Sequence, residues 1–225
     1  MLDFLKFYNR PQTYRAEIRI ELRNTGNTKK ATTLTVPVPM TTAYQTTMPR
    51  FDERSALYEI DLKPGEQKVI LVPFKAHVMP RRYEGRIAPE ITRANQFVIE
   101  YLTYGNPIDG LYTAQEARDK RVVDCGGFDT LLQDELKKKD IESNVVAGFW
   151  SDGNMHAWLE IGTIPADPSM EYLRKHGRTR KSGMLGFVGS DRIAFSTGNP
   201  FLQHPFLKEE DNEIIHENNF YCTRA

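Results

Sequence analysis

The hydrophobic period of this sequence changes once along the chain, from two residues to about 3.6, and no other feature limits the possible folds as much. In residues 14–23 every second residue is apolar, and the residues between them are all charged. This alternation is typical of a β-strand with one buried face. It predicts that the first part of the chain forms a β-sheet.

Three further segments continue this pattern and are separated by turn-forming residues. Pro37 and Pro39 confine the first of them to the edge or the end of a sheet, because proline cannot donate a ladder hydrogen bond. We therefore predict a small antiparallel β domain over residues 1–78. The three segments are 34–38, 58–62 and 68–78.

The period changes after a polar segment, 79–92, which we interpret as a linker because it contains two prolines and a glycine. Helices are predicted first and strands after them, so residues 93–225 are expected to form a second domain. The predicted fold class is α+β. The expected helices lie near 97–102, from Thr113 onward and after Asp124, and the expected strands are 144–149, 157–161 and 193–196.

The balance of charge argues against two classes of partner. Thirty lysine and arginine residues cancel thirty aspartate and glutamate residues, so no net field attracts nucleic acid or an anionic membrane surface. The longest uncharged apolar stretch, 145–150, is far shorter than the roughly 18 residues that cross a bilayer. Segment 1–10 does not contain the apolar core of a secretory signal. We expect a cytoplasmic protein without a nucleic-acid or membrane partner.

The cysteines and histidines indicate neither a disulfide framework nor a metal site. The chain has only Cys125 and Cys222, which rules out paired CxxC zinc motifs. Its five histidines form no HExxH or HxxxH pair. We expect no metal and no cofactor, and the sequence leaves the oligomeric state open.

Cys125 is the candidate nucleophile. It stands at the start of a predicted helix, where unpaired N–H groups and the positive end of the helix dipole favour a thiolate and lower the pKa of the thiol. Gly126 and Gly127 follow it, and we expect them to leave room for a substrate. The alternative is that Cys125 is a small buried apolar residue.

His156 and Asp167 follow at positions that suit a base and its orienting carboxylate. His156 begins a strand beside a turn, so we expect a partly solvated ring that accepts the thiol proton. Asp167 comes where the next short strand should end, and its carboxylate could fix the tautomer of the ring. Taken singly, the histidine could be a packed or surface residue and the Asp-Pro pair only a turn. In this order, however, the three residues are the parts of an activated-thiol triad.

These motifs resemble the core of the transglutaminase-like superfamily. The pattern of that family is a Cys that opens a helix, a His in a His-Ala-Trp strand and an Asp in an Asp-Pro-Ser/Thr turn, which match Cys125, His156 and Asp167. Segment 140–148 (DIESNVVAG) also resembles the family's "GIPARVVSGY" segment. The likeness spans about residues 93–200, and the alternating strands before it resemble the β domain that often precedes this core.

The resemblance implies a papain-like α+β core and cysteine-dependent acyl transfer on amide bonds of peptides or proteins. Cys125 would be the nucleophile, His156 the acid and base, and Asp167 the residue that orients His156. The thioester would then pass to water or to another amine. Calcium, which animal transglutaminases use, is not indicated, because the sequence has no acidic cluster of EF-hand type.

Two aromatic residues are further candidates for the cleft. The animal enzymes place a tryptophan upstream of the cysteine, and here no tryptophan precedes Cys125, so Tyr104 is the candidate hydroxyl donor to an oxyanion. Its alternative role is packing. Trp158 is a candidate for the lining of the cleft or for the core. The sequence leaves open whether the reaction is hydrolysis or amine exchange, and it also allows a catalytically silent interaction module of the same fold.

Overall fold

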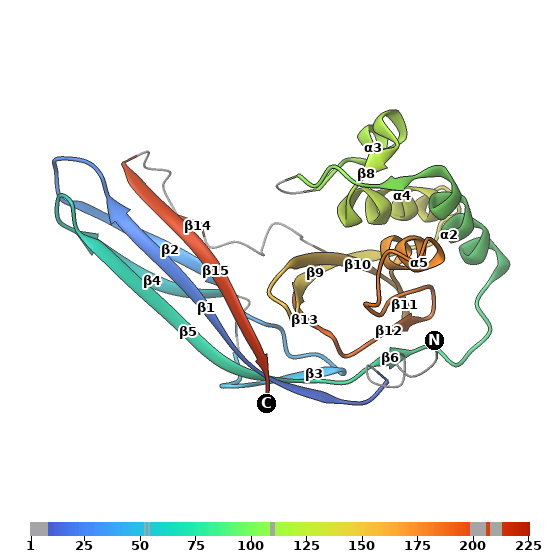
Figure 1. Cartoon of the computed structure of the whole chain (residues 1–225), viewed down its shortest axis with the longest axis horizontal. Helices are drawn as coiled ribbons and strands as arrows, with labels where there is room; N and C mark the ends of the chain where they lie inside the picture. The colour runs from blue at the N-terminus through green and yellow to red at the C-terminus, as the bar shows by residue number, and fades with distance from the viewer. Residues whose placement is uncertain (1–8, 52, 54, 109–110, 199–205, 208–212) are drawn as a thin grey trace.

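The computed structural model describes residues 9–51, 53, 55–108, 111–198, 206–207 and 213–225. These residues form a β-sandwich and an α+β unit that packs against it (Figure 1). Residues 1–8, which carry the expectation about export, and residues 199–200, at the end of the family likeness, lie outside the described residues. Element labels below are those of Figure 1.

The β-sandwich consists of a sheet with the strand order β15-β1-β5-β3 and a second sheet with the order β14-β2-β4. The strand predicted over residues 14–23 is confirmed as part of β1. Its apolar side chains, such as Ile20 at 0% exposure, point into the core between the sheets. The strands are β1 (Gln12–Asn24), β2 (Lys30–Pro37), β3 (Gln45–Met48), β4 (Ser55–Leu62), β5 (Gln67–Val78), β14 (Phe206–Leu207) and β15 (Ile214–Arg224).

The α+β unit contains an antiparallel sheet with the order β11-β10-β9-β13, and its helices lie over one face of this sheet (Figure 1). Apolar side chains of α4, including Phe128 and Leu132, are fully buried against the sheet and the other helices. The predicted α+β fold class is confirmed. The elements are β6 (Arg81–Arg82), α2 (Pro89–Tyr101), β7 (Thr103–Tyr104), α3 (Ala114–Lys120), β8 (Val122–Val123), α4 (Cys125–Lys137), β9 (Asn144–Trp150), β10 (Met155–Ile161), β11 (Ile164–Ala166), α5 (Pro168–Lys175), β12 (Phe187–Val188) and β13 (Arg192–Thr197).

Two helix starts follow from local sequence signals. Thr113 caps α3 in the predicted capping box, in which its hydroxyl accepts from the backbone of Glu116 and the glutamate side chain accepts from the backbone of Thr113. Asp124 caps α4 through a bond of 3.2 Å from the backbone of Gly127. As a result, Cys125 is the first residue of α4, as predicted.

The position of strand β15 differs from the predicted division of the chain into two domains. β15 pairs antiparallel with β1 along its whole length, so residues 214–224 belong to the sheet of the sandwich and not to the second unit, as the range 93–225 implied. Phe220 and Cys222 pack against the sandwich core. The polar residues 216–219 before them interrupt the alternation of apolar and polar residues that would have indicated a strand. The predicted linker 79–92 also contains structure, since β6 pairs with β12 and α2 begins at Pro89.

The described helices include none that is long and apolar enough to span a bilayer.

Candidate active site

The amino end of α4 presents the thiol of Cys125 to the strand that carries His156. The backbone N–H of Ala157, the residue after His156, hydrogen-bonds to the sulfur. Cys125 is half-buried, and it is a free cysteine. The Asp124 cap also ties the preceding loop to this helix end, since its second carboxylate oxygen accepts from the backbone of Ile108 at 3.1 Å.

The two glycines after Cys125 serve packing, which corrects the expectation that they leave room for a substrate. A Cβ atom at Gly126 would lie 2.4 Å from Leu111, and one at Gly127 would lie 2.5 Å from Val123. Both glycines are buried. The two glycines therefore let the side chains of Leu111 and Val123 pack directly against the backbone of α4.

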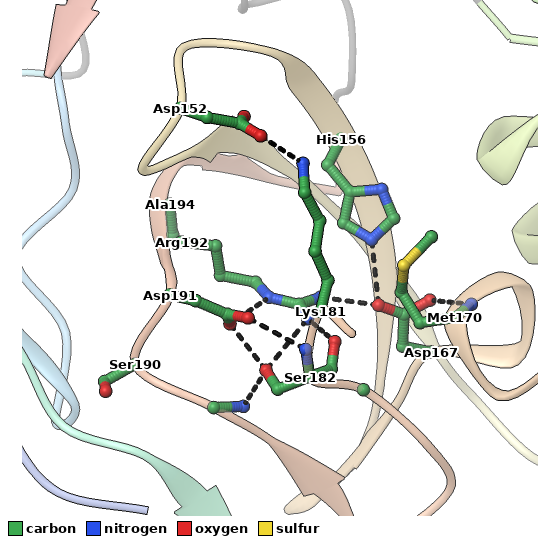
Figure 2. A network of polar contacts seen from close by, with 12 residues as sticks. Asp152, His156, Asp167, Met170, Lys181, Ser182, Ser190, Asp191, Arg192 and Ala194 are labelled. Atoms are coloured by element: carbon green, nitrogen blue, oxygen red, sulfur yellow. Dashed lines mark hydrogen bonds and ion pairs between the residues drawn. The ribbon is translucent and has the colours of Figure 1, made fainter. Parts of the chain in front are cut away.

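His156 is buried at 2% exposure, so the expectation of a partly solvated ring is wrong. Its imidazole stacks on the indole of Trp150, with the ring centres 4.2 Å apart. The Nε2 atom lies 2.8 Å from Oδ2 of Asp167 (Figure 2). The predicted contact between the histidine and the orienting carboxylate is therefore present in the structure.

Asp167 directly follows the end of β11, as the sequence predicted, and it also caps α5, a helix that the sequence analysis did not predict. One carboxylate oxygen accepts from the backbone of Met170 at 3.0 Å and from the hydroxyl of Ser169 at 2.9 Å. The other accepts from His156 and from Arg192 at 2.8 and 2.5 Å. These donors hold the carboxylate of Asp167 in one orientation.

Arg192 is a residue of this site that the sequence analysis missed. It is the first residue of β13, and its guanidinium is 2% exposed. The guanidinium lies over the rings of Trp150 and Trp158, at 4.0 and 5.3 Å from their centres. It also donates to Asp167, as Figure 2 shows. The available signal was a charged side chain at the start of an apolar strand, a position where charge is rarely buried without a partner.

Further hydrogen bonds hold the Arg192 guanidinium in place. Its guanidinium also donates to the backbone oxygen of Ser182 and approaches Asp191 at 3.5 Å. The Ser182 hydroxyl in turn donates to Asp191 at 2.5 Å. Gly183 follows at a φ of +136°, and a Cβ atom there would lie 2.5 Å from the carboxylate of Asp167, so the close approach of this loop requires glycine.

The protonation of the site differs from the expectation of a thiolate. Burial raises the pKa of the Cys125 thiol, and the nearby Asp129, Asp124 and Asp167 raise it further. The hydrogen bond from the Ala157 N–H lowers this pKa, but by less. The net direction is opposite to the lowered pKa that we expected at a helix start, because burial and the acidic neighbours disfavour the thiolate. Burial also lowers the pKa of His156, although Asp167 opposes this shift.

The pKa of Asp167 is well below its usual range. Burial alone would raise it, but the charges of His156 and Arg192 and their hydrogen bonds outweigh burial. Near neutral pH, the resting arrangement is therefore a protonated thiol, a neutral imidazole and an ionised carboxylate.

Tyr104 lies close to the thiol. Its strand β7 runs parallel to β8, and Tyr104 pairs with Val123, two residues before Cys125. Burial raises the pKa of the phenol, and the proximity of Cys125, Asp124 and Asp167 adds to the rise. Its ring also packs beside Phe128, with centres 6.2 Å apart. The hydroxyl is therefore protonated and can donate a hydrogen bond.

Trp158 is a buried residue at 3% exposure, and its indole lies behind Arg192 and His156. Together with Arg192, it lines a cavity of about 300 Å³ between the core sheet and the sandwich. Of the two roles that the sequence left open for Trp158, the structure supports packing. Among the described side chains, no cluster of three or more His, Cys, Asp and Glu residues could hold a metal ion.

The comparisons with known proteins bear on the fold. No family model matches the chain, and no curated protein matches it. Among solved structures, a "Putative Cysteine Protease" from Cytophaga hutchinsonii is similar, with 10% sequence identity and a TM-score of 0.59. The similarity covers 96% of this chain and 91% of that chain, so the two share a fold that includes both the β-sandwich and the α+β unit.

Proposed function

We propose that this protein is a transglutaminase-like enzyme that uses Cys125 to attack amide bonds of peptides or proteins. The observation that carries the proposal is the buried hydrogen bond between His156 and Asp167 at 2.8 Å. In support, the backbone N–H of Ala157, the residue after His156, hydrogen-bonds to the sulfur of Cys125. A base that is oriented by a carboxylate and adjacent to a nucleophile is the arrangement that covalent catalysis requires.

The first step transfers the thiol proton to His156 while the sulfur attacks the amide carbon. Because Asp167 engages Nε2, the proton is received on Nδ1, the other ring nitrogen. The carbonyl oxygen becomes an oxyanion, and the candidate donors to it are the Cys125 backbone N–H and the Tyr104 hydroxyl. Collapse of this intermediate breaks the C–N bond, and the departing amine takes the proton from His156.

The second step releases the acyl group from the thioester on Cys125. Water or a second amine attacks the thioester carbon and gives its proton to His156, and the sulfur leaves and regains a proton. Water gives hydrolysis and an amine gives exchange. We propose hydrolysis or amine exchange through this thioester, with a peptide or protein amide as the substrate and with no metal or cofactor.

The resting protonation supports a general-base route. A thiol that keeps its proton needs His156 to be neutral, so the reaction rate should rise as pH increases through the lowered pKa of His156. The preformed thiolate–imidazolium pair of other cysteine enzymes would give a rate limited by thiolate formation at low pH.

Replacement of the sulfur tests the proposal. Cys125→Ala should abolish amidase and amine-incorporation activity toward a panel of glutamine peptides and amine probes, because no nucleophile remains. The melting temperature should stay within a few degrees. The matched control is Cys222→Ala, since Cys222 is a half-buried cysteine on β15 with a pKa raised to about 12 by burial. Activity that survives Cys125→Ala contradicts the proposal.

One observation favours a second candidate function, a catalytically silent interaction module. The raised pKa of the Cys125 thiol would make the sulfur a slow nucleophile without the help of a base. The rate at which iodoacetamide alkylates Cys125 distinguishes the two. Slow alkylation that is indifferent to His156→Ala, together with no turnover of any probe, supports the silent module.

A further inference from the structure

Asp129 is a buried acid beside the nucleophile that the proposed reaction does not use. It lies on α4, four residues after Cys125, and its side chain is 0% exposed. Side chains four residues apart share one face of a helix and lean toward its amino end, so the carboxyl of Asp129 leans toward the thiol. Neither carboxyl oxygen has a hydrogen-bond partner among the residues that the structure describes.

The surroundings of Asp129 are unfavourable for a negative charge. The ionisable groups that act on it are Asp124 at the helix start, Asp167 before α5 and Arg192 on β13, and Asp129 itself acts on Cys125. The one cation among them, Arg192, already binds Asp167. A buried carboxylate without a partner has a large desolvation penalty, and the protonated form avoids it. In agreement, burial and the two neighbouring aspartates raise the pKa of Asp129 well above its usual range.

We propose that Asp129 is a positioning residue that keeps its proton in the working site, and that its ionisation switches off the nucleophile. This proposal rests on the proposed function of Cys125. Under this proposal, the ionisation of Asp129 sets the highest pH at which Cys125 reacts.

The physical basis is the charge that the sulfur acquires. When the thiol proton passes to His156, the sulfur becomes anionic for a moment before its bond to carbon forms. A protonated Asp129 adds no opposing charge at this stage, and its O–H can donate a hydrogen bond to a sulfur anion. An ionised Asp129 repels the sulfur anion and holds the proton on the thiol.

The test measures the alkylation of Cys125 by iodoacetamide as a function of pH, in a Cys222→Ser background so that one thiol reports. In Asp129→Asn no ionisation occurs at this position, so the alkylation rate should equal that of the parent near neutral pH. It should exceed the parent rate by about tenfold at alkaline pH, which corresponds to about one pKa unit. The matched control, Asp134→Asn, changes a half-buried carboxylate farther along α4 and should leave the profile unchanged.

A second measurement needs no substitution at Asp129. In the chain labelled with ¹³C at its aspartate carboxyls, one buried signal should retain the shift of a protonated acid through neutral pH. Alkylation profiles that coincide for the parent and Asp129→Asn overturn the proposal. If Asp129→Asn does not fold, ionisation of every labelled carboxyl below neutral pH overturns it. Neither readout requires turnover, so the proposal for Asp129 can fail while the Cys125 dependence of the activity stands.

Discussion

The β-sandwich and the α+β unit differ in the charge of their buried polar side chains. Among the described residues, the buried polar side chains of the sandwich are Gln12, Asn24 and Gln45, and none of them is charged. The interior of the α+β unit instead holds an arginine and three aspartates at 2% exposure or less, namely Arg192, Asp129, Asp167 and Asp191. One interior is held by apolar packing and the other partly by a network of charges.

The difference separates stability from chemistry. Buried ionic groups are a weak source of stability, because their attraction must first offset the loss of hydration. Their presence in the α+β unit is therefore best explained by the geometry that they impose on His156. Changes in the sandwich should alter the free energy of unfolding alone, and changes in the charged network should also alter the reaction.

The largest effect is expected for Asp167→Asn. The amide cannot hold the imidazole of His156 in the required tautomer, so kcat should fall by about 10⁴-fold. Steady-state kinetics with the best peptide substrate provides the measurement. The control is Asp152→Asn, which removes an exposed carboxylate paired with Lys181 and should change kcat less than twofold. If kcat fell by a similar factor in both variants, the buried charged network around Asp167 would have no special role in the reaction.

The next effect is the loss of a buried charge partner in Arg192→Met. The carboxylates of Asp167 and Asp191 would lose their cation, so the free energy of unfolding should fall by about 3–5 kcal/mol, as measured by urea denaturation. Arg93→Met breaks an exposed pair with Glu90 and should lower it by no more than about 1 kcal/mol. A stable Arg192→Met variant with full activity would contradict the comparison between the two interiors.

The smallest effect is expected for Ile20→Val in the sandwich core. Removal of one fully buried methylene should lower the free energy of unfolding by about 0.5–1.5 kcal/mol and leave kcat unchanged. Leu71→Val, on the outer face of the neighbouring strand, should change stability by less than about 0.5 kcal/mol. If Ile20→Val lowered kcat, the two units would be coupled more closely than their contrasting interiors suggest.

The sequence predicted the elements whose residues carry a strong local signal. Strand β1 followed from ten alternating residues, the start of α3 followed from its capping box, and α4 was expected after Asp124. The pairing of β15 with β1 could not be predicted, because its polar residues break the alternation and its partner lies far away in the chain. α5 was missed because it is short and its cap, Asp167, was interpreted only as an orienting carboxylate.

The candidate site was predictable as a set of residue types but not in its electrostatics. The contact between His156 and Asp167 agrees with the predicted triad. Arg192 and Asp129 escaped notice, because the burial of a charged side chain depends on contacts between distant segments that leave no local pattern. For the same reason, the direction of the pKa shift of Cys125 could not be predicted from its place at a helix start.

The strand β15 has a consequence for how the chain is made. The Thr223 hydroxyl donates a hydrogen bond to the backbone oxygen of Arg15, 208 residues earlier, so the ribosome makes β1 long before it makes the partner strand β15. Until then one edge of the long strand β1 presents unpaired backbone groups, which is a template for aggregation. Chains that stop before residue 214 lack this partner strand, so they should aggregate more readily than chains that include β15.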